Sequence, residues 1–173
     1  MRLHAQIGEY DMTDIILDLG SEVNVLTKQT WEQMGKPTLD WSPIQLRLAN
    51  QQKIVPLGRF PSVSVDIDGV STLAYFEVIE IIDDRNPYPA LLGIEWEIDN
   101  DAVINLKKRQ MTFEGKGLRV IVPLDPSQGD VNFSYALLRH QYIISFFIIK
   151  AYKAGSLKET VSQEQHIFIL GKP

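Results

Sequence analysis

The stretch that decides the fold is Asp14-Ile15-Ile16-Leu17-Asp18-Leu19-Gly20-Ser21. Its apolar run, Ile15 to Leu17, is typical of a strand covered on both faces. The run ends in a carboxylate, Asp18, which a turn at Gly20 follows. An acid at the end of a buried strand is costly to desolvate unless a neighbouring group compensates it. Two interpretations are open at this point: a functional carboxylate held on a rigid strand, or an Asp that accepts backbone hydrogen bonds in an ordinary turn.

The composition is that of a globular chain with one domain, or with a smaller domain and a tail. Of the 173 residues, 45% are apolar and 23% are charged, and there is no cysteine, which excludes disulfides and thiolate chemistry. The net charge of -5 disfavours binding to nucleic acid. Residues 1–130 carry 12 Lys and Arg against 20 Asp and Glu, a net charge of -8, whereas residues 131–173 carry 5 against 2, a net charge of +3. This shift in charge predicts a boundary near residue 130.

Targeting and metal-binding signals are weak. Residues 1–6 contain no apolar core of signal-peptide length. The longest apolar stretch of the tail, Tyr142 to Ile149, is too short to span a bilayer. The histidines His4, His140 and His166 do not have the spacing of metal ligands. We therefore expect an intracellular, cytoplasmic protein without a metal, a cofactor or a membrane partner.

Turn signals divide residues 3–124 into about eight short strands. Residues 44–57 form a hairpin pattern with a polar tip, and Asp68-Gly69 is a strong two-residue hairpin turn. A short helix is expected over residues 27–34, with Gly35 as its stop, and a second over residues 94–101, with its acidic residues mostly outward. Short strands at close spacing predict a small all-β barrel or closed sandwich with one or two short helices. The expected domain is 3–124, and the linker and tail, 125–173, are not assigned to it.

The order of these elements is informative. Asp18-Leu19-Gly20-Ser21 precedes Leu91-Leu92-Gly93 by about seventy residues, with both hairpins between the two motifs and a short helix after the second. Over roughly residues 5–115 this arrangement resembles the retropepsin-like aspartic proteases, especially those of plant long-terminal-repeat retrotransposon (gag-pol) polyproteins. The resemblance implies a small closed barrel of the acid-protease type.

The resemblance also implies roles for individual residues. Asp18 is the expected catalytic carboxylate, Gly20 provides the tight turn and a backbone amide near that carboxylate, and Ser21 donates to its outer oxygen. The hairpin of residues 45–58 is the expected flap over the substrate. The remaining implied positions are the flap tip, Ala49, Asn50, Gln51 and Gln52, and the apolar pair with its glycine, Leu91, Leu92 and Gly93, packed behind the catalytic loop.

One residue departs from the family pattern. Leu19 stands where the family has Thr or Ser, whose hydroxyl braces the two catalytic loops across the two-fold axis. Losing that bond leaves a buried partner group unsatisfied, at about 1–3 kcal/mol per subunit. We therefore expect Leu19 to affect the strength of the dimer and the catalytic activity.

The expected chemistry needs a partner subunit. Peptide hydrolysis by this route uses two carboxylates that share a proton, so that one acts as a base and the other as an acid. The chain supplies one such motif, which predicts a C2 homodimer acting on a polypeptide substrate. Two hypotheses follow: an active homodimeric aspartic endopeptidase, or a catalytically degenerate domain that serves as a dimerisation or structural module.

Overall fold

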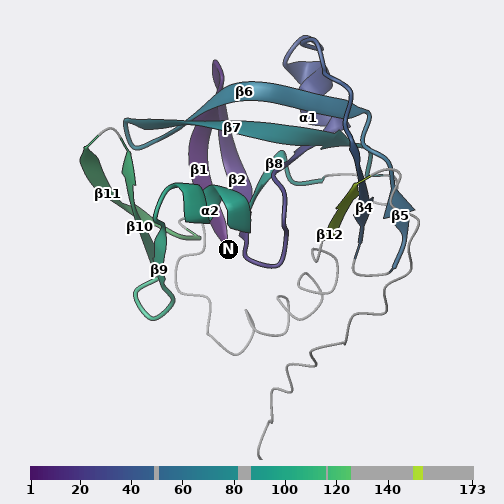
Figure 1. The fold of residues 1–173 in the computed structure, drawn as a ribbon. Coiled ribbons are helices and arrows are strands. Elements are labelled where there is room, and N and C mark those ends of the chain that lie inside the picture. The colour runs from purple at the N-terminus through teal and green to yellow at the C-terminus, as the bar shows by residue number, and fades with distance from the viewer. Residues whose placement is uncertain (49–50, 82–86, 116, 126–149, 154–173) are drawn as a thin grey trace, which may run out of the picture.

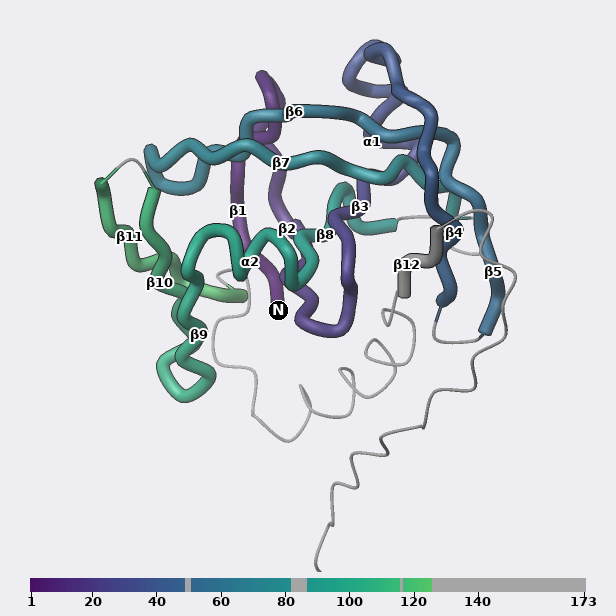
Figure 2. Tube along the Cα trace, in the orientation of Figure 1, coloured from purple at the N-terminus to yellow at the C-terminus, as the bar shows by residue number. Residues whose placement is uncertain are grey.

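A closed barrel of six strands forms the centre of the computed structural model, which describes residues 1–48, 51–81, 87–115, 117–125 and 150–153 (Figures 1 and 2). The strand order around the barrel is β1-β2-β8-β3-β7-β6. This confirms the predicted closed all-β barrel. Its strands are β1 (Arg2–Ile7), β2 (Tyr10–Asp18), β3 (Val25–Thr27), β6 (Gly58–Ile67), β7 (Val70–Ile79) and β8 (Ala90–Gly93).

Two three-stranded sheets and two short helices complete the described part of the chain. One sheet has the strand order β12-β4-β5 and the other has the order β11-β10-β9. Their strands are β4 (Ile44–Arg47), β5 (Lys53–Ile54), β9 (Val103–Asn105), β10 (Gln110–Gly115), β11 (Leu118–Pro123) and β12 (Lys150–Lys153), and the helices are α1 (Lys28–Gln33) and α2 (Ile94–Asp99). No helix among the described residues is long and apolar enough to cross a membrane.

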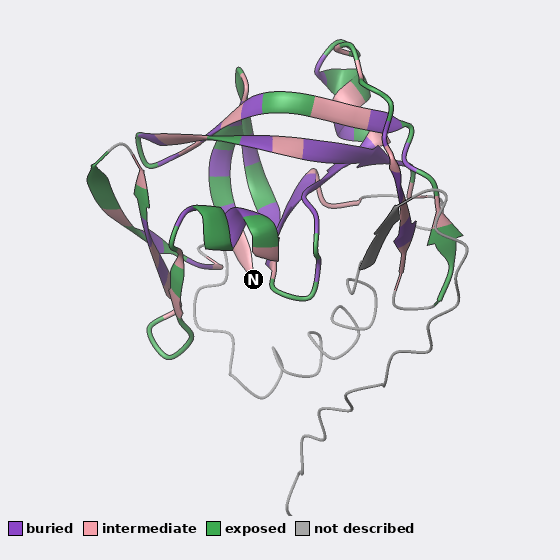
Figure 3. Ribbon diagram, in the orientation of Figure 1, coloured by how far each residue is buried: buried purple, intermediate pink, exposed green. Residues whose placement is uncertain are grey.

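Strand β2 is covered on both faces, as its apolar run predicts. Ile15 and Leu17 pack into the main core of the barrel. Ile16 belongs to a second apolar cluster, which includes Leu46 of β4 and Leu91 of β8. Figure 3 shows the buried residues concentrated on the strands that line the barrel. The strand that ends in Asp18 is therefore fixed between two cores.

Local sequence signals set the predicted turns. Asp68 and Gly69 both have positive φ angles, 51° and 81°, which suits a tight hairpin between β6 and β7. Thr27 caps α1, because its side chain accepts a hydrogen bond from the backbone N–H of Thr30. Gly35 follows the helix with a φ of 82°. These features confirm the predicted hairpin turn and the first predicted helix.

The first strand, β1, is joined by reciprocal hydrogen bonds to Asp125, which follows β11. The backbone N–H of Arg2 donates to Oδ1 of Asp125 at 2.8 Å. The backbone N–H of Asp125 donates to the carbonyl of Arg2 at 2.7 Å. Leu124 is buried beside this clasp. Residues 2 and 125 therefore lie next to each other.

One tail segment, β12, pairs with β4 of the hairpin that was expected to be the flap. Strand β12 runs antiparallel to β4, with Lys150 opposite Arg47 and Lys153 opposite Ile44. From the sequence, none of the tail was expected to belong to the fold, so this pairing was not predicted. The apolar tail stretch from Tyr142 to Ile149 lies outside the described residues.

Candidate active site

Asp18 is the last residue of β2 and directly precedes a tight turn. In the parallel pair of β2 with β8, it is opposite Gly93. The backbone N–H of Gly20 donates to Oδ1 of Asp18 at 2.9 Å. The backbone N–H of Ser21 donates to the carbonyl oxygen of Asp18 at 3.1 Å. Gly20 thus supplies both the turn and an amide on the carboxylate, as the resemblance implies.

The second oxygen of Asp18 has a different environment. Oδ2 is buried and has no hydrogen-bond partner among the described residues. Burial raises the pKa of Asp18, while the Gly20 amide and the positive N-terminal amine act in the opposite direction. A carboxyl group with one oxygen held and the other unpartnered is suited to share a proton with a second acid.

The residues on either side of Gly20 differ in exposure. Leu19 is 50% exposed and lies next to the half-buried Asp18. Ser21 is fully buried, and its hydroxyl donates to the carbonyl of Val23 at 2.8 Å. The expected bond from Ser21 to Asp18 is therefore wrong for this structure. A buried hydroxyl takes the backbone acceptor two residues along the chain, and this bond braces the turn.

The strand-to-helix junction at Gly93 packs directly against this turn. A Cβ atom on Gly93 would lie 2.8 Å from the carbonyl oxygen of Ser21 and closer still to that of Val23. The backbone N–H of Ile94 donates to the carbonyl of Ser21 at 2.8 Å. Leu91-Leu92 is fully buried behind it. The motif of β8 and the turn after β2 therefore form one closely packed unit.

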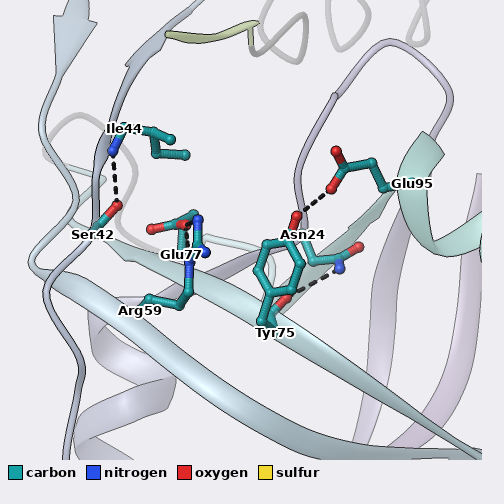
Figure 4. Close-up of polar contacts among 7 residues, drawn as sticks. All are labelled: Asn24, Ser42, Ile44, Arg59, Tyr75, Glu77 and Glu95. Atoms are coloured by element: carbon teal, nitrogen blue, oxygen red, sulfur yellow. Dashed lines mark hydrogen bonds and ion pairs between the residues drawn. The ribbon is translucent and has the colours of Figure 1, made fainter. Parts of the chain in front are cut away.

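Asn24 joins this unit to β7, on the far side of β3, a role that the sequence analysis missed. Its Oδ1 accepts the backbone N–H of Gly93 at 2.9 Å. Its Nδ2 donates to the carbonyl of Tyr75 at 3.1 Å, as Figure 4 shows. Its own carbonyl accepts the N–H of Glu77 at 2.9 Å. The available signal was an amide residue inside the apolar stretch that follows the turn.

A polar network surrounds Asn24 on β6 and β7 (Figure 4). Glu77 is fully buried, and its Oε1 is 2.6 Å from Nη2 of Arg59. The Arg59 guanidinium lies over the Tyr75 ring, 4.5 Å from its centre. The Tyr75 hydroxyl donates to Glu95 of α2. Burial, followed by this bond to Glu95, raises the pKa of Tyr75 to about 12, so that the hydroxyl stays a donor.

Glu97 on α2 corrects one sequence expectation. The acidic residues of this helix were expected to be mostly outward, but Glu97 is 4% exposed, and both its carboxylate oxygens lack partners among the described residues. Trp96 and Glu97 both face the core because the helix begins directly behind the turn of Asp18. Burial, followed by the charge of Asp18, raises the pKa of Glu97 to about 7.

The expected flap is a short hairpin of β4 and β5. Leu48 and Gln52 close it, since the N–H of Leu48 donates to the carbonyl of Gln52 at 2.9 Å. Gln51 has a positive φ of 67° at the turn. Two of the four expected tip residues, Ala49 and Asn50, lie outside the described residues. The hairpin is thus present, with half of its tip described.

A cavity of about 540 Å³ lies away from this site. Tyr10, Asp14, Gln33 and Tyr88 are among its lining residues, and Asp18 is not. Within the part of the chain that the structure describes, no three His, Asp or Glu side chains are grouped so as to hold a metal ion. The chemistry-bearing group at the turn is the carboxylate of Asp18.

Comparison with known proteins supports the fold. The chain matches no protein-family model and no curated protein sequence. It is similar to the crystal structure of the retroviral protease-like domain of Ddi1 from Leishmania major, with a TM-score of 0.54 and 19% sequence identity. The match covers 73% of this chain and 91% of that chain. At this identity the likeness establishes the fold alone, which is retropepsin-like.

Proposed function

We propose that the protein is an aspartic endopeptidase that acts as a homodimer on extended polypeptides. The observation that carries this proposal is the environment of Asp18. One of its oxygens accepts a backbone amide, and the other is buried without a partner among the described residues. The resemblance of its sequence to plant retrotransposon proteases suggests a polyprotein as the natural substrate class.

The proposed reaction uses Asp18 and its copy in the second subunit. Two carboxyl groups about 3 Å apart cannot both ionise, so one stays protonated while the other is charged. The charged one takes a proton from a water molecule, whose oxygen attacks the peptide carbonyl. The neutral one gives its proton to the carbonyl oxygen, which forms a tetrahedral diol. The carboxyl group that took the proton from water then gives it to the peptide nitrogen, the C–N bond breaks and the amine leaves, while a diol hydroxyl returns its proton to the other carboxylate. Burial already raises the pKa of Asp18 in one subunit, which favours the shared proton.

Leu19 favours contact between two copies. It is half exposed and lies next to Asp18, at the position that meets its own copy in a two-fold dimer of this kind. Two apolar side chains packed across the axis bury surface that a lone subunit leaves in water. This contact is the proposed substitute for the hydroxyl bond that the family makes there.

The test is cleavage of an unfolded polypeptide such as denatured casein at mildly acidic pH. We expect cleavage that a statine-type inhibitor blocks and that Asp18→Asn abolishes. The matched control is Asp68→Asn, which makes the same substitution at an Asp within the hairpin turn between β6 and β7. Asn suits the positive φ of 51° at that position, so this variant keeps wild-type activity. Equal rates for wild type and Asp18→Asn would refute the proposal.

Leu19 also supports a second candidate function, a degenerate domain that only dimerises or folds. In that case the protein is folded and no cleavage depends on Asp18. Leu19→Thr separates the two candidates, because it restores the hydroxyl that the family uses. Activity that appears in Leu19→Thr, and is lost again in Leu19→Thr with Asp18→Asn, identifies Leu19 as the lesion.

A further inference from the structure

The cavity away from Asp18 is a feature that the proposed chemistry does not use. Its volume of about 540 Å³ lies within the range of ligand-binding sites in proteins. Residues of β2 form one of its walls, residues of α1 form another, and the segment 87–89 forms a third. The question is which ligand its lining fits.

Hydrogen bonds and buried side chains hold these walls in place. Thr27, the cap of α1, donates both its backbone N–H and its hydroxyl to the carbonyl of Pro89, at 3.2 Å and 3.4 Å. Three apolar lining residues, Met12, Ile16 and Met34, are buried. A cavity with fixed walls loses little conformational freedom when a ligand binds.

A bulge in β2 places a carboxylate in the lining. The register of β1 with β2 shifts between Leu3 and Ala5, so that Thr13 and Asp14 together stand opposite the single residue His4. Asp14 has a positive φ of 61°, a conformation that Asp and Asn adopt more readily than other residues with a side chain. Bulges of this kind change the direction of a strand's side chains.

The charges of the lining favour a cation. Asp11 and Asp14 contribute two carboxylates, and Arg2 contributes one guanidinium. Nη1 of Arg2 is 3.1 Å from Oδ1 of Asp14, and Nε2 of His4 is 2.6 Å from Oδ1 of Asp11. Oδ2 of each carboxylate remains without a bond to any described residue. Residues 1–130 carry a net charge of -8, which attracts cations toward this part of the chain.

The uncharged lining suits a planar cation in particular. Tyr10 and Tyr88 contribute aromatic rings, whose faces attract cations. Gln29 and Gln33 lie four residues apart on α1, both are exposed, and neither side chain is bonded within the described ranges. Their carbonyl oxygens can therefore accept from a ligand. A guanidinium is planar, has five N–H donors and binds both aromatic faces and carboxylates, whereas an ammonium is compact and strongly hydrated.

We propose that this cavity binds an arginine side chain of a polypeptide. A free arginine is a poorer ligand, because its α-carboxylate meets the two acids of the lining, whereas an arginine within a peptide has no such charge. The proposal goes beyond the proposed function, since binding needs neither Asp18 nor cleavage. It is measured in the full chain carrying Asp18→Asn. Failure of binding then contradicts the arginine site, and failure of cleavage in the wild-type chain contradicts the protease.

The probe is the labelled, end-blocked peptide Gly-Gly-Ala-Arg-Ala-Gly-Gly, measured by fluorescence anisotropy at about 0.1 M salt. Its counterpart has citrulline in place of arginine, which keeps the shape and removes the charge. Free arginine is measured as a competitor of the labelled peptide. We expect the arginine peptide to bind at least about tenfold more tightly than either the citrulline peptide or free arginine. Affinity equal to that of either one, or no binding, would overturn the proposal.

Asp14→Asn and Asp68→Asn form a matched pair of variants. Both positions have a positive φ, 61° and 51°, which Asn suits, and both substitutions remove one negative charge, but Asp68 does not line the cavity. We expect Asp14→Asn to weaken binding of the arginine peptide about three- to tenfold, and Asp68→Asn to leave it unchanged. Equal affinity of the two variants would contradict the site. Thermal unfolding of both chains checks that the barrel is intact.

Arg2→Gln tests the site in the opposite direction and does not depend on Asp14→Asn folding. It removes the cation that competes for Asp14, and it keeps the bonds to Asp125, which the backbone of Arg2 makes. We expect the arginine peptide to bind about two- to fivefold more tightly. Weaker binding, or no change in affinity, would overturn the proposal.

Discussion

Glu97 is an acidic residue whose surroundings disfavour its charged form. It is 4% exposed, both its oxygens lack partners in the described part of the chain, and the charge of Asp18 lies near enough to raise its pKa further, to about 7. The positive N-terminal amine is the group that acts in the opposite direction. A buried acid of this kind is held neutral in the folded protein at mildly acidic pH.

The pH dependence of stability should therefore change in Glu97→Gln. The pKa of Glu97 is raised on folding, from 4.5 to about 7, so the unfolded carboxyl ionises first as the pH rises. The free energy of unfolding of the wild type then falls between those two values, by an amount on the order of 2–3 kcal/mol from this residue. Urea unfolding from pH 4 to 8 measures it. The difference between wild type and Glu97→Gln should grow across this interval, and a constant difference would contradict the assignment.

Gly93 has no room for a side chain. An added methyl group would collide with backbone carbonyls of Ser21 and Val23, which belong to the turn that holds Asp18. We expect Gly93→Ala to lower the free energy of unfolding by about 1–3 kcal/mol, because backbone at both sides of the contact must shift. Denaturant unfolding measures the loss. Gly69→Ala is not a suitable control, because Gly69 has a positive φ. Thr13→Ala, at an exposed position of β2, should cost much less.

At the scale of elements, the site depends on how the turn after β2 is joined to β7 and β8. Asn24 makes that junction with three hydrogen bonds: one to the amide of Gly93, one to the carbonyl of Tyr75 and one from the amide of Glu77. The side-chain bonds are the ones that a substitution removes. The turn of Asp18 is thus positioned by strands that lie more than fifty residues later in the chain.

Asn24→Ala should therefore loosen the junction. It leaves the buried amide of Gly93 and the carbonyl of Tyr75 without their partners, at about 1–3 kcal/mol for an unsatisfied buried group. We expect a lower free energy of unfolding. In the proposed enzyme we also expect kcat to fall by a larger factor than KM changes. The measurement is hydrogen exchange of the Gly93 amide, together with kinetics. Asn105→Ala, which removes an acceptor on an exposed turn, should leave the exchange of Gly93 unchanged.

The sequence predicted the elements around Asp18 better than the contacts between them. The apolar run of β2, the Asp68-Gly69 turn and the first helix with its stop at Gly35 are local signals, and each was confirmed. The roles of Asn24 and Glu97 depend on packing between distant segments, which neither periodicity nor turn chemistry reports. Pairing of β12 with β4 joins positions about a hundred residues apart in the chain. Its register follows from where the barrel places β4, so no local pattern could predict it.

On the scale of the whole molecule, we propose that the folded unit ends at residues 124–125, as the sequence analysis expected. Leu124 is buried, and Asp125 closes the clasp with Arg2. A chain of residues 1–125 should unfold in one cooperative transition near the melting temperature of the full chain. A chain of residues 1–117 loses β11 and Leu124, so it should melt at a clearly lower temperature. Circular dichroism during heating tests both, and equal melting of the two fragments would contradict this boundary.

The proposed dimer predicts the mass of the full chain in solution. We expect twice the mass of one chain at high concentration by analytical ultracentrifugation. Leu19→Glu places two like charges across the proposed axis and should shift the protein to the monomer. Leu73→Glu is the control, because Leu73 is an exposed apolar residue on β7, away from the turn. If Leu19→Glu and Leu73→Glu lower the mass in solution equally, the dimer contact does not lie at Leu19.

The clasp between Arg2 and Asp125 has a consequence for how the gene can be rearranged. Because residues 2 and 125 lie next to each other, a few added residues suffice to connect the two ends of the segment 1–125. New ends can then be opened at the exposed hairpin of Asp68, giving a circular permutant with every barrel strand retained. The same adjacency allows the domain to be spliced into a surface loop of a host protein without pulling the host's loop apart.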